Sequence, residues 1–212
     1  MTSLLVNHIL QTEKWTSPEL FETKNRIYTF LNPVSYLIAL ENKSLFEQFD
    51  GIFADGSLLV SAIRLVYGKR VTRRSFDMTS LAPELLNYLM ESRKTLYIVA
   101  SGQEQVECSV RIFQEQYPEL RIAGFRNGYF SSDAEMNKEA SHIVELNPDF
   151  LIVGMGALMQ EKFLLKVKKM GYQGIGFTCG GFVHQTAMNR MHYYPAVSYT
   201  HLRAHETTLH LV

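Results

Sequence analysis

Short apolar runs alternate with longer amphipathic stretches along the 212 residues of the chain. A compact run of β-branched and aromatic residues bounded by Gly, Asn or Asp predicts a buried strand, whereas apolar residues repeating every three to four positions predict a helix. The strand pattern occurs at residues 26–31, 51–54, 95–101, 120–125, 149–156 and 174–181.

The helical pattern fills the intervals between these runs. It predicts helices over residues 34–42, 57–68, 80–93, 104–117, 132–147 and 160–171. Local end signals agree: Pro83 suits a first turn, and Ser132 or Asp133 suits an N-cap ahead of Glu135. Repeated strand–helix alternation with nearly continuous apolar strands predicts an α/β fold, with a mostly parallel sheet and helices on both faces.

Composition limits the class of protein. With 46% hydrophobic and 12% aromatic residues, we expect residues 1–196 to form a single domain with a full core. The 21 basic and 21 acidic side chains balance, which gives no support for a nucleic-acid partner, although residues 69–74 form a local basic patch. Cys108 and Cys179 have no CxxC or zinc spacing and are typical of reduced thiols in a cytoplasmic protein.

The chain shows no targeting or membrane-spanning pattern. No segment approaches the roughly 18–20 apolar residues of a membrane span. The first residues lack the basic region and the small-residue cleavage site of a signal peptide. We therefore expect a cytoplasmic location.

Candidate chemistry gathers where the predicted strands end, because ligands bind outside the carboxyl ends of strands in open α/β sheets. Asn32 follows the first strand and Asp55 the second. Asp55 has two possible roles: an N-cap for the helix that begins near Ser57, or a general base. The helix starts after Gly56, Gly102 and Met159 present N–H groups suited to a diphosphate.

Common cofactor motifs are missing from the sequence. There is no GxGxxG fingerprint, no Walker motif, no GxSxG elbow and no DxD-type pair. A nicotinamide-dependent oxidoreductase is therefore disfavoured, and we expect neither a cofactor nor a metal site. His201 and His205, four residues apart, superficially suggest a metal site beside Glu206. However, "SYTHLRAHET" resembles translated sequencing-adapter sequence, so we expect residues 197–212 to be a non-native tail.

A set of segments in order carries a family resemblance. "TFLNPVSYLIA", "FADGSLLV", "RRSFDMTSLAPELL", "FRNGYF", "PDFLIVGMGALMQEKF" and "CGGFVHQTA" together resemble the WecG/TagA/CpsF family of bacterial glycosyltransferases. The resemblance spans residues 26–195 and is specific as a set, although no single segment is.

That resemblance implies a Rossmann-like fold and an inverting, metal-independent glycosyltransferase. The family moves an N-acetylhexosamine-type sugar, N-acetylmannosamine or its uronic acid, from a UDP donor to a polyprenyl-diphosphate-linked acceptor. It acts at the cytoplasmic face of the membrane in teichoic acid, enterobacterial common antigen or capsule synthesis. The resemblance also implies peripheral membrane contact and a homo-oligomer. The family has in addition a C-terminal appendage, and we expect this chain to lack that appendage.

The resemblance also assigns residues. It implies that Asp55 is the catalytic base, that Asn32 and Gln160 line its pocket, and that either Arg73 or Arg74, just ahead of Asp77, contacts the donor diphosphate. Other candidate binding residues, from the strand ends and the QE pair, are Gly102, Tyr129, Gly156, Glu161 and Gly180.

Three departures from the family pattern stand out. Phe30 stands two residues before Asn32 where the family often has Thr. Ser75 replaces a glycine, and Val183-His184 follows Phe182 where the family has FD. These features are similar to a capsule-type subgroup, so the donor sugar stays open. The alternative function is a catalytically impaired nucleotide-sugar-binding module.

Overall fold

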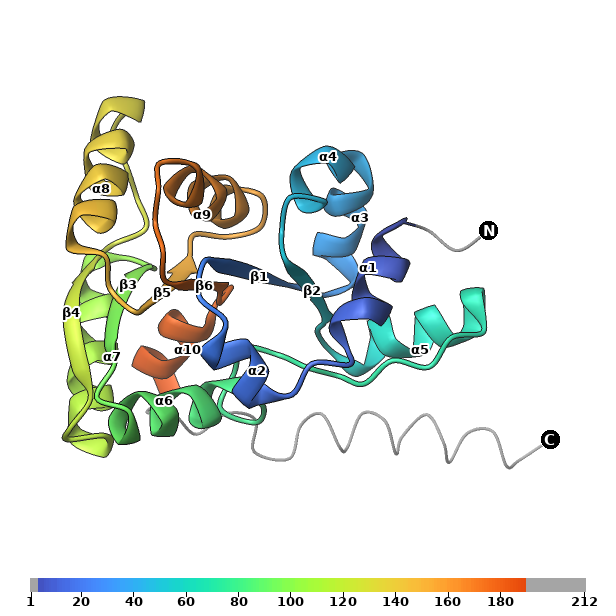
Figure 1. Cartoon of the computed structure of the whole chain (residues 1–212), viewed down its shortest axis with the longest axis horizontal. Helices are drawn as coiled ribbons and strands as arrows, with labels where there is room; N and C mark the ends of the chain where they lie inside the picture. The colour runs from blue at the N-terminus through green and yellow to red at the C-terminus, as the bar shows by residue number, and fades with distance from the viewer. Residues whose placement is uncertain (1–3, 190–212) are drawn as a thin grey trace.

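The computed structural model describes residues 4–189, and its strands form one six-stranded parallel sheet (Figure 1). The strand order is β2-β1-β6-β5-β3-β4. The strands are β1 (Arg26–Leu31), β2 (Gly51–Ala54), β3 (Thr95–Ala100), β4 (Arg121–Arg126), β5 (Phe150–Gly154) and β6 (Ile175–Thr178). The predicted α/β fold with a parallel sheet is confirmed.

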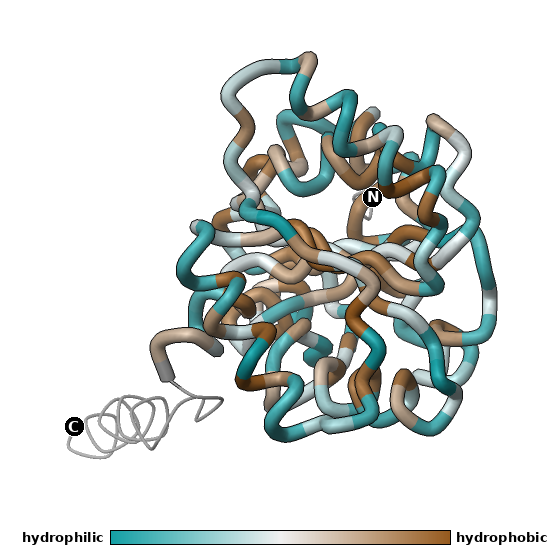
Figure 2. Tube along the Cα trace, turned by 90° about the vertical axis from the view of Figure 1, so that its left-hand side faces the viewer, coloured by the Kyte–Doolittle hydropathy of each residue, from teal (hydrophilic) through white to brown (hydrophobic). Residues whose placement is uncertain are grey.

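Helices cover both faces of this sheet. They are α1 (Leu4–Thr12), α2 (Ser17–Glu22), α3 (Pro33–Glu41), α4 (Lys43–Phe46), α5 (Ser57–Tyr67), α6 (Leu81–Glu91), α7 (Gln103–Gln116), α8 (Asp133–Leu146), α9 (Met159–Lys169) and α10 (Phe182–Asn189). Figure 2 shows hydrophobic strands running through the middle of the fold, with hydrophilic residues on much of its outside.

The pleat of each strand divides the core into two clusters. Along β1, Ile27 and Leu31 join the cluster under α1, α3, α4, α5, α8 and α9, whereas Tyr28 and Phe30 join the one under α2, α6, α7 and α10. Successive side chains of a strand point to opposite faces, so a strand buried on both faces is apolar throughout. This explains why the inner strands are nearly continuous apolar runs.

Several helices lie outside the predicted set. Nothing was predicted before Arg26, where α1 buries Leu5, Val6 and Ile9 and α2 buries Leu20. The short α4 and the helix α10 were also missed. The strands predicted over 149–156 and 174–181 end earlier because the residues that follow them turn sharply.

The connections open a crevice at the carboxyl edge of the sheet. After β1 and β5 the chain enters α3 and α9 on one face, whereas after β3 and β6 it enters α7 and α10 on the other. Neighbouring strands β6, β5 and β3 therefore send their helices to alternate faces. Such switch points are where open α/β sheets bind ligands.

At the opposite end of the sheet, where the strands begin, a cluster of charged residues joins neighbouring elements. Asp50 accepts hydrogen bonds from the Ile27 N–H at 2.8 Å, from Arg26 at 2.8 Å and from Lys168 at 2.5 Å. Burial by itself would raise the pKa of Asp50, but these three donors outweigh it and hold that pKa below its ordinary 3.8. This carboxylate has a structural role, far from the crevice.

Candidate active site

A cleft of about 1580 Å³ occupies the carboxyl edge of the sheet. Most of the predicted site residues line it: Asn32, Asp55, Arg73, Asp77, Gly102, Tyr129, Gly156, Gln160 and Gly180. Arg74 and Glu161 lie outside this lining. The fold therefore brings together residues that are as far apart in sequence as Asn32 and Gly180.

Asp55 stands directly after β2, and its backbone N–H continues the sheet by donating to the Leu31 carbonyl at 2.8 Å. The N-cap of α5 is Gly56, and no side-chain capping bond is made there, so the capping role considered for Asp55 is wrong. The Asp55 carboxylate instead accepts a hydrogen bond from the Ser75 hydroxyl. It faces the cleft with part of its surface accessible.

The surroundings of Asp55 shift its titration. Burial raises the pKa of the Asp55 carboxyl above its ordinary 3.8. The Ser75 hydrogen bond and the Arg73 charge oppose that rise, and the negative charge of Asp77 adds to it. A carboxylate with a raised pKa is better matched to accepting a proton near neutral pH.

The two candidate arginines point to different places. The Arg73 guanidinium lines the cleft and is held by Asp77 at 2.6 Å and by the Thr79 hydroxyl at 3.1 Å. The Arg74 guanidinium instead donates to the Trp15 carbonyl at 2.8 Å and lies 5.2 Å from the centre of the Phe53 ring. Geometry therefore favours Arg73 as the group available to a bound anion.

Glu161 belongs to a buried hydrogen-bond network behind the cleft. It has no exposed surface, and its Oε1 accepts from the Thr29 hydroxyl at 2.9 Å and from the Gln160 amide at 2.9 Å. Its Oε2 accepts from the Leu158 N–H at 2.6 Å. Burial raises the pKa of Glu161, and these donors work against that rise.

The same network reaches the cleft wall through Gln160. The side-chain carbonyl of Gln160 accepts from the Gly180 N–H at 3.1 Å, so the loop after β6 is tied to the start of α9. On the other side, the Thr178 hydroxyl donates to Thr29 at 2.9 Å and joins β6 to β1. Gln160 and Gly180 are thus fixed relative to one another by a direct hydrogen bond and by the buried network behind it.

Glycines shape the turns that border the cleft. Gly56, Gly156 and Gly180 have φ of 83°, 83° and 51°, a left-handed conformation that residues with a Cβ adopt at a cost. The N-caps of α5 and α7, Gly56 and Gly102, make no side-chain capping bond. Their first-turn N–H groups are left for an anion, as at many phosphate sites.

Asn32 combines a local and a cleft position. Its Oδ1 caps α3 by accepting from the Val34 N–H at 3.0 Å and the Ser35 N–H at 2.9 Å. Asn32 therefore serves as the N-cap of α3 and also lies in the lining of the cleft. Its amide NH₂ group is the part that can donate to a ligand.

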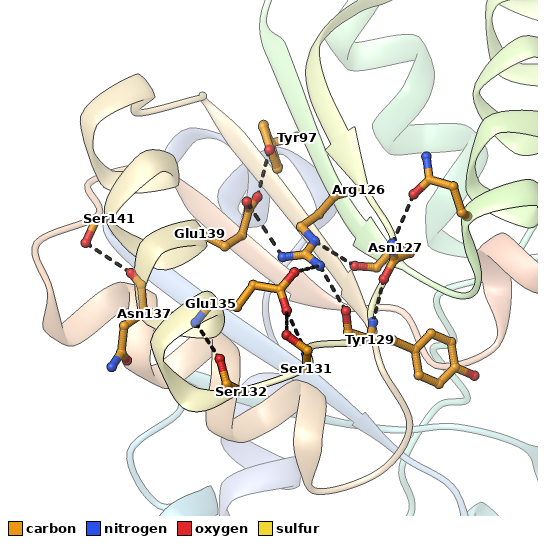
Figure 3. A network of polar contacts seen from close by, with 11 residues as sticks. Tyr97, Arg126, Asn127, Tyr129, Ser131, Ser132, Glu135, Asn137, Glu139 and Ser141 are labelled. Atoms are coloured by element: carbon orange, nitrogen blue, oxygen red, sulfur yellow. Dashed lines mark hydrogen bonds and ion pairs between the residues drawn. The ribbon is translucent and has the colours of Figure 1, made fainter.

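Tyr129 lies on the rim, 75% exposed, on a loop that Arg126 holds in place (Figure 3). Arg126 donates to the backbone carbonyls of Asn127 at 3.0 Å and Tyr129 at 2.9 Å and to Glu135 at 3.1 Å. Its guanidinium also lies 4.0 Å from the centre of the Phe130 ring. The loop is ordered by its own contacts, and the Tyr129 ring is left facing solvent.

Some cleft residues were not predicted as members of the site. The helix α10 brings Phe182, His184 and Gln185 into the lining. The signal for this helix in the sequence is the helical spacing of Phe182, Val183 and Thr186. The structure buries all three side chains. The sequence marks Ser75 as a departure from the family pattern but carries no sign of its contact with Asp55.

Two negative findings concern residues 4–189. No helix in this part of the chain is both long and apolar enough to cross a membrane. The same residues contain no cluster of three or more His, Cys, Asp and Glu side chains placed to hold a metal ion. His201, His205 and the tail of residues 197–212 lie outside the described residues.

Comparison with known proteins adds a family and named relatives. The description "Glycosyl transferase WecG/TagA/CpsF family" matches residues 9–192. A protein of Shigella boydii is 31% identical over 190 residues, which cover 90% of this chain and 76% of that protein. It is named UDP-Gal:alpha-D-GlcNAc-diphosphoundecaprenol beta-1,4-galactosyltransferase.

Two Bacillus proteins are more distant. That of Bacillus subtilis (strain 168) is 23% identical over 159 residues, covering 73% of this chain and 60% of that protein. That of Bacillus spizizenii is 23% identical over 165 residues, covering 76% and 62%. Both are named N-acetylglucosaminyldiphosphoundecaprenol N-acetyl-beta-D-mannosaminyltransferase, and the chain spans less than two thirds of their length.

The extent of these matches decides the class of protein. The chain belongs to the WecG/TagA/CpsF family of glycosyl transferases. The family expected from the sequence segments is thereby confirmed.

The buried network gives a first prediction. Replacing Glu161 with Ala leaves the Leu158 N–H, the Thr29 hydroxyl and the Gln160 amide without their acceptor, so we expect the free energy of unfolding to fall by about 3 kcal/mol or more. Urea denaturation measures this, with exposed Lys162→Ala as the control on the same helix. Equal stability of the two variants would contradict the structural role of Glu161.

Proposed function

We propose that this protein transfers a sugar from a UDP donor to a polyprenyl-diphosphate-linked sugar, with inversion and with Asp55 as the general base. The observation that carries the proposal is the position of Asp55: a carboxylate with raised pKa, in a cleft beside Arg73 and two uncapped helix N-termini. The names of the three relatives support a diphosphoundecaprenol-linked GlcNAc acceptor.

The reaction is a single displacement in this account. The acceptor hydroxyl gives its proton to Asp55 as its oxygen bonds to the anomeric carbon, and the bond from that carbon to the UDP oxygen breaks. UDP leaves with the bonding electron pair, so negative charge grows on the diphosphate. Arg73 and the N–H groups at the starts of α5 and α7 are the groups that stabilise this charge.

The remaining candidate residues shape the donor site. We propose that Asn32 and Gln160 orient the sugar, that Gly102, Gly156 and Gly180 let the backbone approach the donor, and that Tyr129 stacks on a ring of the donor. Asp77 acts by holding the Arg73 guanidinium through the ion pair at 2.6 Å.

The donor sugar has two candidates. The N-acetylhexosamine expected from the family resemblance agrees with the names of the Bacillus relatives, whereas the name of the Shigella boydii relative specifies UDP-Gal. UDP release measured with UDP-Gal, UDP-ManNAc and UDP-GlcNAc in turn, each with a short-chain GlcNAc-diphosphate lipid, decides between them. A catalytically impaired binding module would bind UDP and release none with any pair.

We also propose that the protein works at the inner face of the cell membrane, with α5 in contact with the lipid. Exposed apolar side chains, Leu58, Leu65 and Val66, follow helical spacing on α5 and are 68%, 87% and 69% exposed. Exposed Lys69 and Arg70 follow directly. An apolar stripe bordered by cations is typical of a helix that lies in an anionic membrane surface. The same stripe would favour self-association, in line with the expected homo-oligomer.

Asp55→Asn tests the base. The amide keeps the shape of the side chain but cannot take a proton, so we expect kcat for UDP release to fall about 100-fold or more. The UDP dissociation constant should stay near that of the wild type. The wild-type rate should fall with decreasing pH through a midpoint above 3.8, since the pKa of Asp55 is raised. Asp133→Asn, on the exposed start of α8, is the control, and equal rates in both variants would refute the assignment.

Arg73→Gln and Arg74→Gln form a matched pair. Because Arg73 faces the cleft, its loss should raise the UDP dissociation constant about tenfold or more, measured by calorimetry. Arg74→Gln should leave UDP affinity unchanged and lower the unfolding temperature, since the bond to Trp15 is lost. A larger affinity loss in Arg74→Gln would reverse the assignment.

Leu65→Glu tests the lipid contact. Removing an apolar anchor and adding a negative charge should reduce binding to vesicles that contain anionic lipid by about tenfold. Co-sedimentation measures the bound fraction, with Leu146→Glu at the end of α8 as the control. Unchanged binding in Leu65→Glu would exclude α5 as the membrane-facing element.

A further inference from the structure

The hydroxyl of Ser75 is the donor that reaches the Asp55 carboxylate. Ser75 is 1% exposed and lies on the segment of residues 68–80 that joins α5 to α6. Its backbone is fixed on both sides, because the Ser75 N–H donates to Ser80 Oγ at 3.3 Å and its carbonyl accepts from the Leu81 N–H at 3.1 Å. The backbone that carries the Ser75 hydroxyl is therefore fixed by hydrogen bonds of both its N–H and its carbonyl.

The preceding residue docks this segment onto the sheet. The Arg74 N–H donates to the Ala54 carbonyl at 2.9 Å, one residue before Asp55. The donor and the carboxylate are thus carried by two stretches of chain that are bonded to each other. The Ser75–Asp55 contact follows from the backbone arrangement, not from two free side chains meeting.

This contact makes the two carboxylate oxygens unequal. The Oδ1 atom of Asp55 is occupied by Ser75, whereas no hydrogen bond from the described residues reaches Oδ2. Since Asp55 lines the cleft and Oδ2 is not sealed from solvent, Oδ2 is the atom open to a ligand.

We propose that Ser75 is a positioning residue for Asp55: its hydroxyl holds Oδ1 so that Oδ2 faces the cleft as the atom that takes the proton of the acceptor. This inference rests on the proposed function and extends it to a residue for which the family resemblance gives no hydroxyl. The hydrogen bond suits both states of the base. When the proton arrives on Oδ2, Oδ1 becomes the carbonyl-type oxygen and still accepts from Ser75.

The pKa of Asp55 depends on nearby charged groups as well as on the Ser75 hydroxyl. Arg73 and Asp77, from the same segment, act on it by charge and are paired with each other at 2.6 Å, and His184 lines the cleft from α10. Burial favours the neutral acid, and the Ser75 bond favours the ionised form. Loss of the hydroxyl should therefore move the titration of Asp55 to higher pH.

The test compares three variants. Ser75→Ala removes the donor and should shift the acidic limb of the pH profile of UDP release to higher pH, with the rate at the acid end lower by about tenfold. Ser75→Thr retains a hydroxyl and should restore the wild-type profile. Thr72→Ala loosens the same segment by removing the hydrogen bond from the Thr72 hydroxyl to Glu13, touches neither Asp55 nor Ser75, and should leave the profile unchanged.

A second measurement does not depend on turnover. The carboxyl carbon of Asp55, followed by NMR during a pH titration, should titrate at higher pH in Ser75→Ala than in the wild type. An unchanged titration in Ser75→Ala, or an equal shift in Thr72→Ala, overturns the role of Ser75. Absence of turnover in the wild type together with the predicted NMR shift would instead refute the proposed function and leave the Ser75–Asp55 pairing supported.

Discussion

The geometry of this cleft depends on the burial of one carboxylate, Glu161, which forms no ion pair with any cation among residues 4–189. Glu161 is completely buried, and an ionisable group in that position is tolerated only when its oxygens are hydrogen-bonded. Its three donors come from β1, from the neighbouring Gln160 and from the backbone ahead of α9. Because Gln160 in turn holds the Gly180 N–H, the requirement to satisfy one carboxylate fixes the ends of β1 and β6 and the start of α9 together.

Two of the carboxylates near the cleft, Glu161 and Asp55, show how burial leads to different uses. Burial raises the pKa of both Glu161 and Asp55. Both oxygens of Glu161 are taken by protein donors, so no oxygen is left to exchange a proton with a ligand. Asp55 has one oxygen bound to Ser75 and lines the cleft, so its other oxygen is available. The two residues share the direction of their pKa shifts and differ in how many of their oxygens accept hydrogen bonds from the protein. This difference marks Glu161 as a structural acid and Asp55 as a candidate base.

The sequence predicted the parts of this structure that depend on local pattern. The inner strands are apolar on both faces, so their positions and the α/β class followed from periodicity alone, and the strand ends located Asn32, Asp55 and the cleft glycines. The choice between Arg73 and Arg74 did not follow, because adjacent residues of an extended segment point to opposite sides. Which one faces the cleft depends on the bond from the Arg74 N–H to Ala54, a contact across 20 residues that no local pattern reveals. The Thr29–Glu161 bond, 132 residues apart in sequence, was hidden for the same reason.

The central claim is that Asp55 assists one direct displacement at the anomeric carbon of the donor. The stereochemistry of the product tests this most directly, because a single displacement inverts the anomeric carbon. The anomeric proton coupling in the NMR spectrum of the purified lipid-linked product reports its configuration. The account predicts a configuration opposite to that of the UDP-sugar. A product that retains the configuration of the donor would contradict it, since retention requires two displacements or a different mechanism.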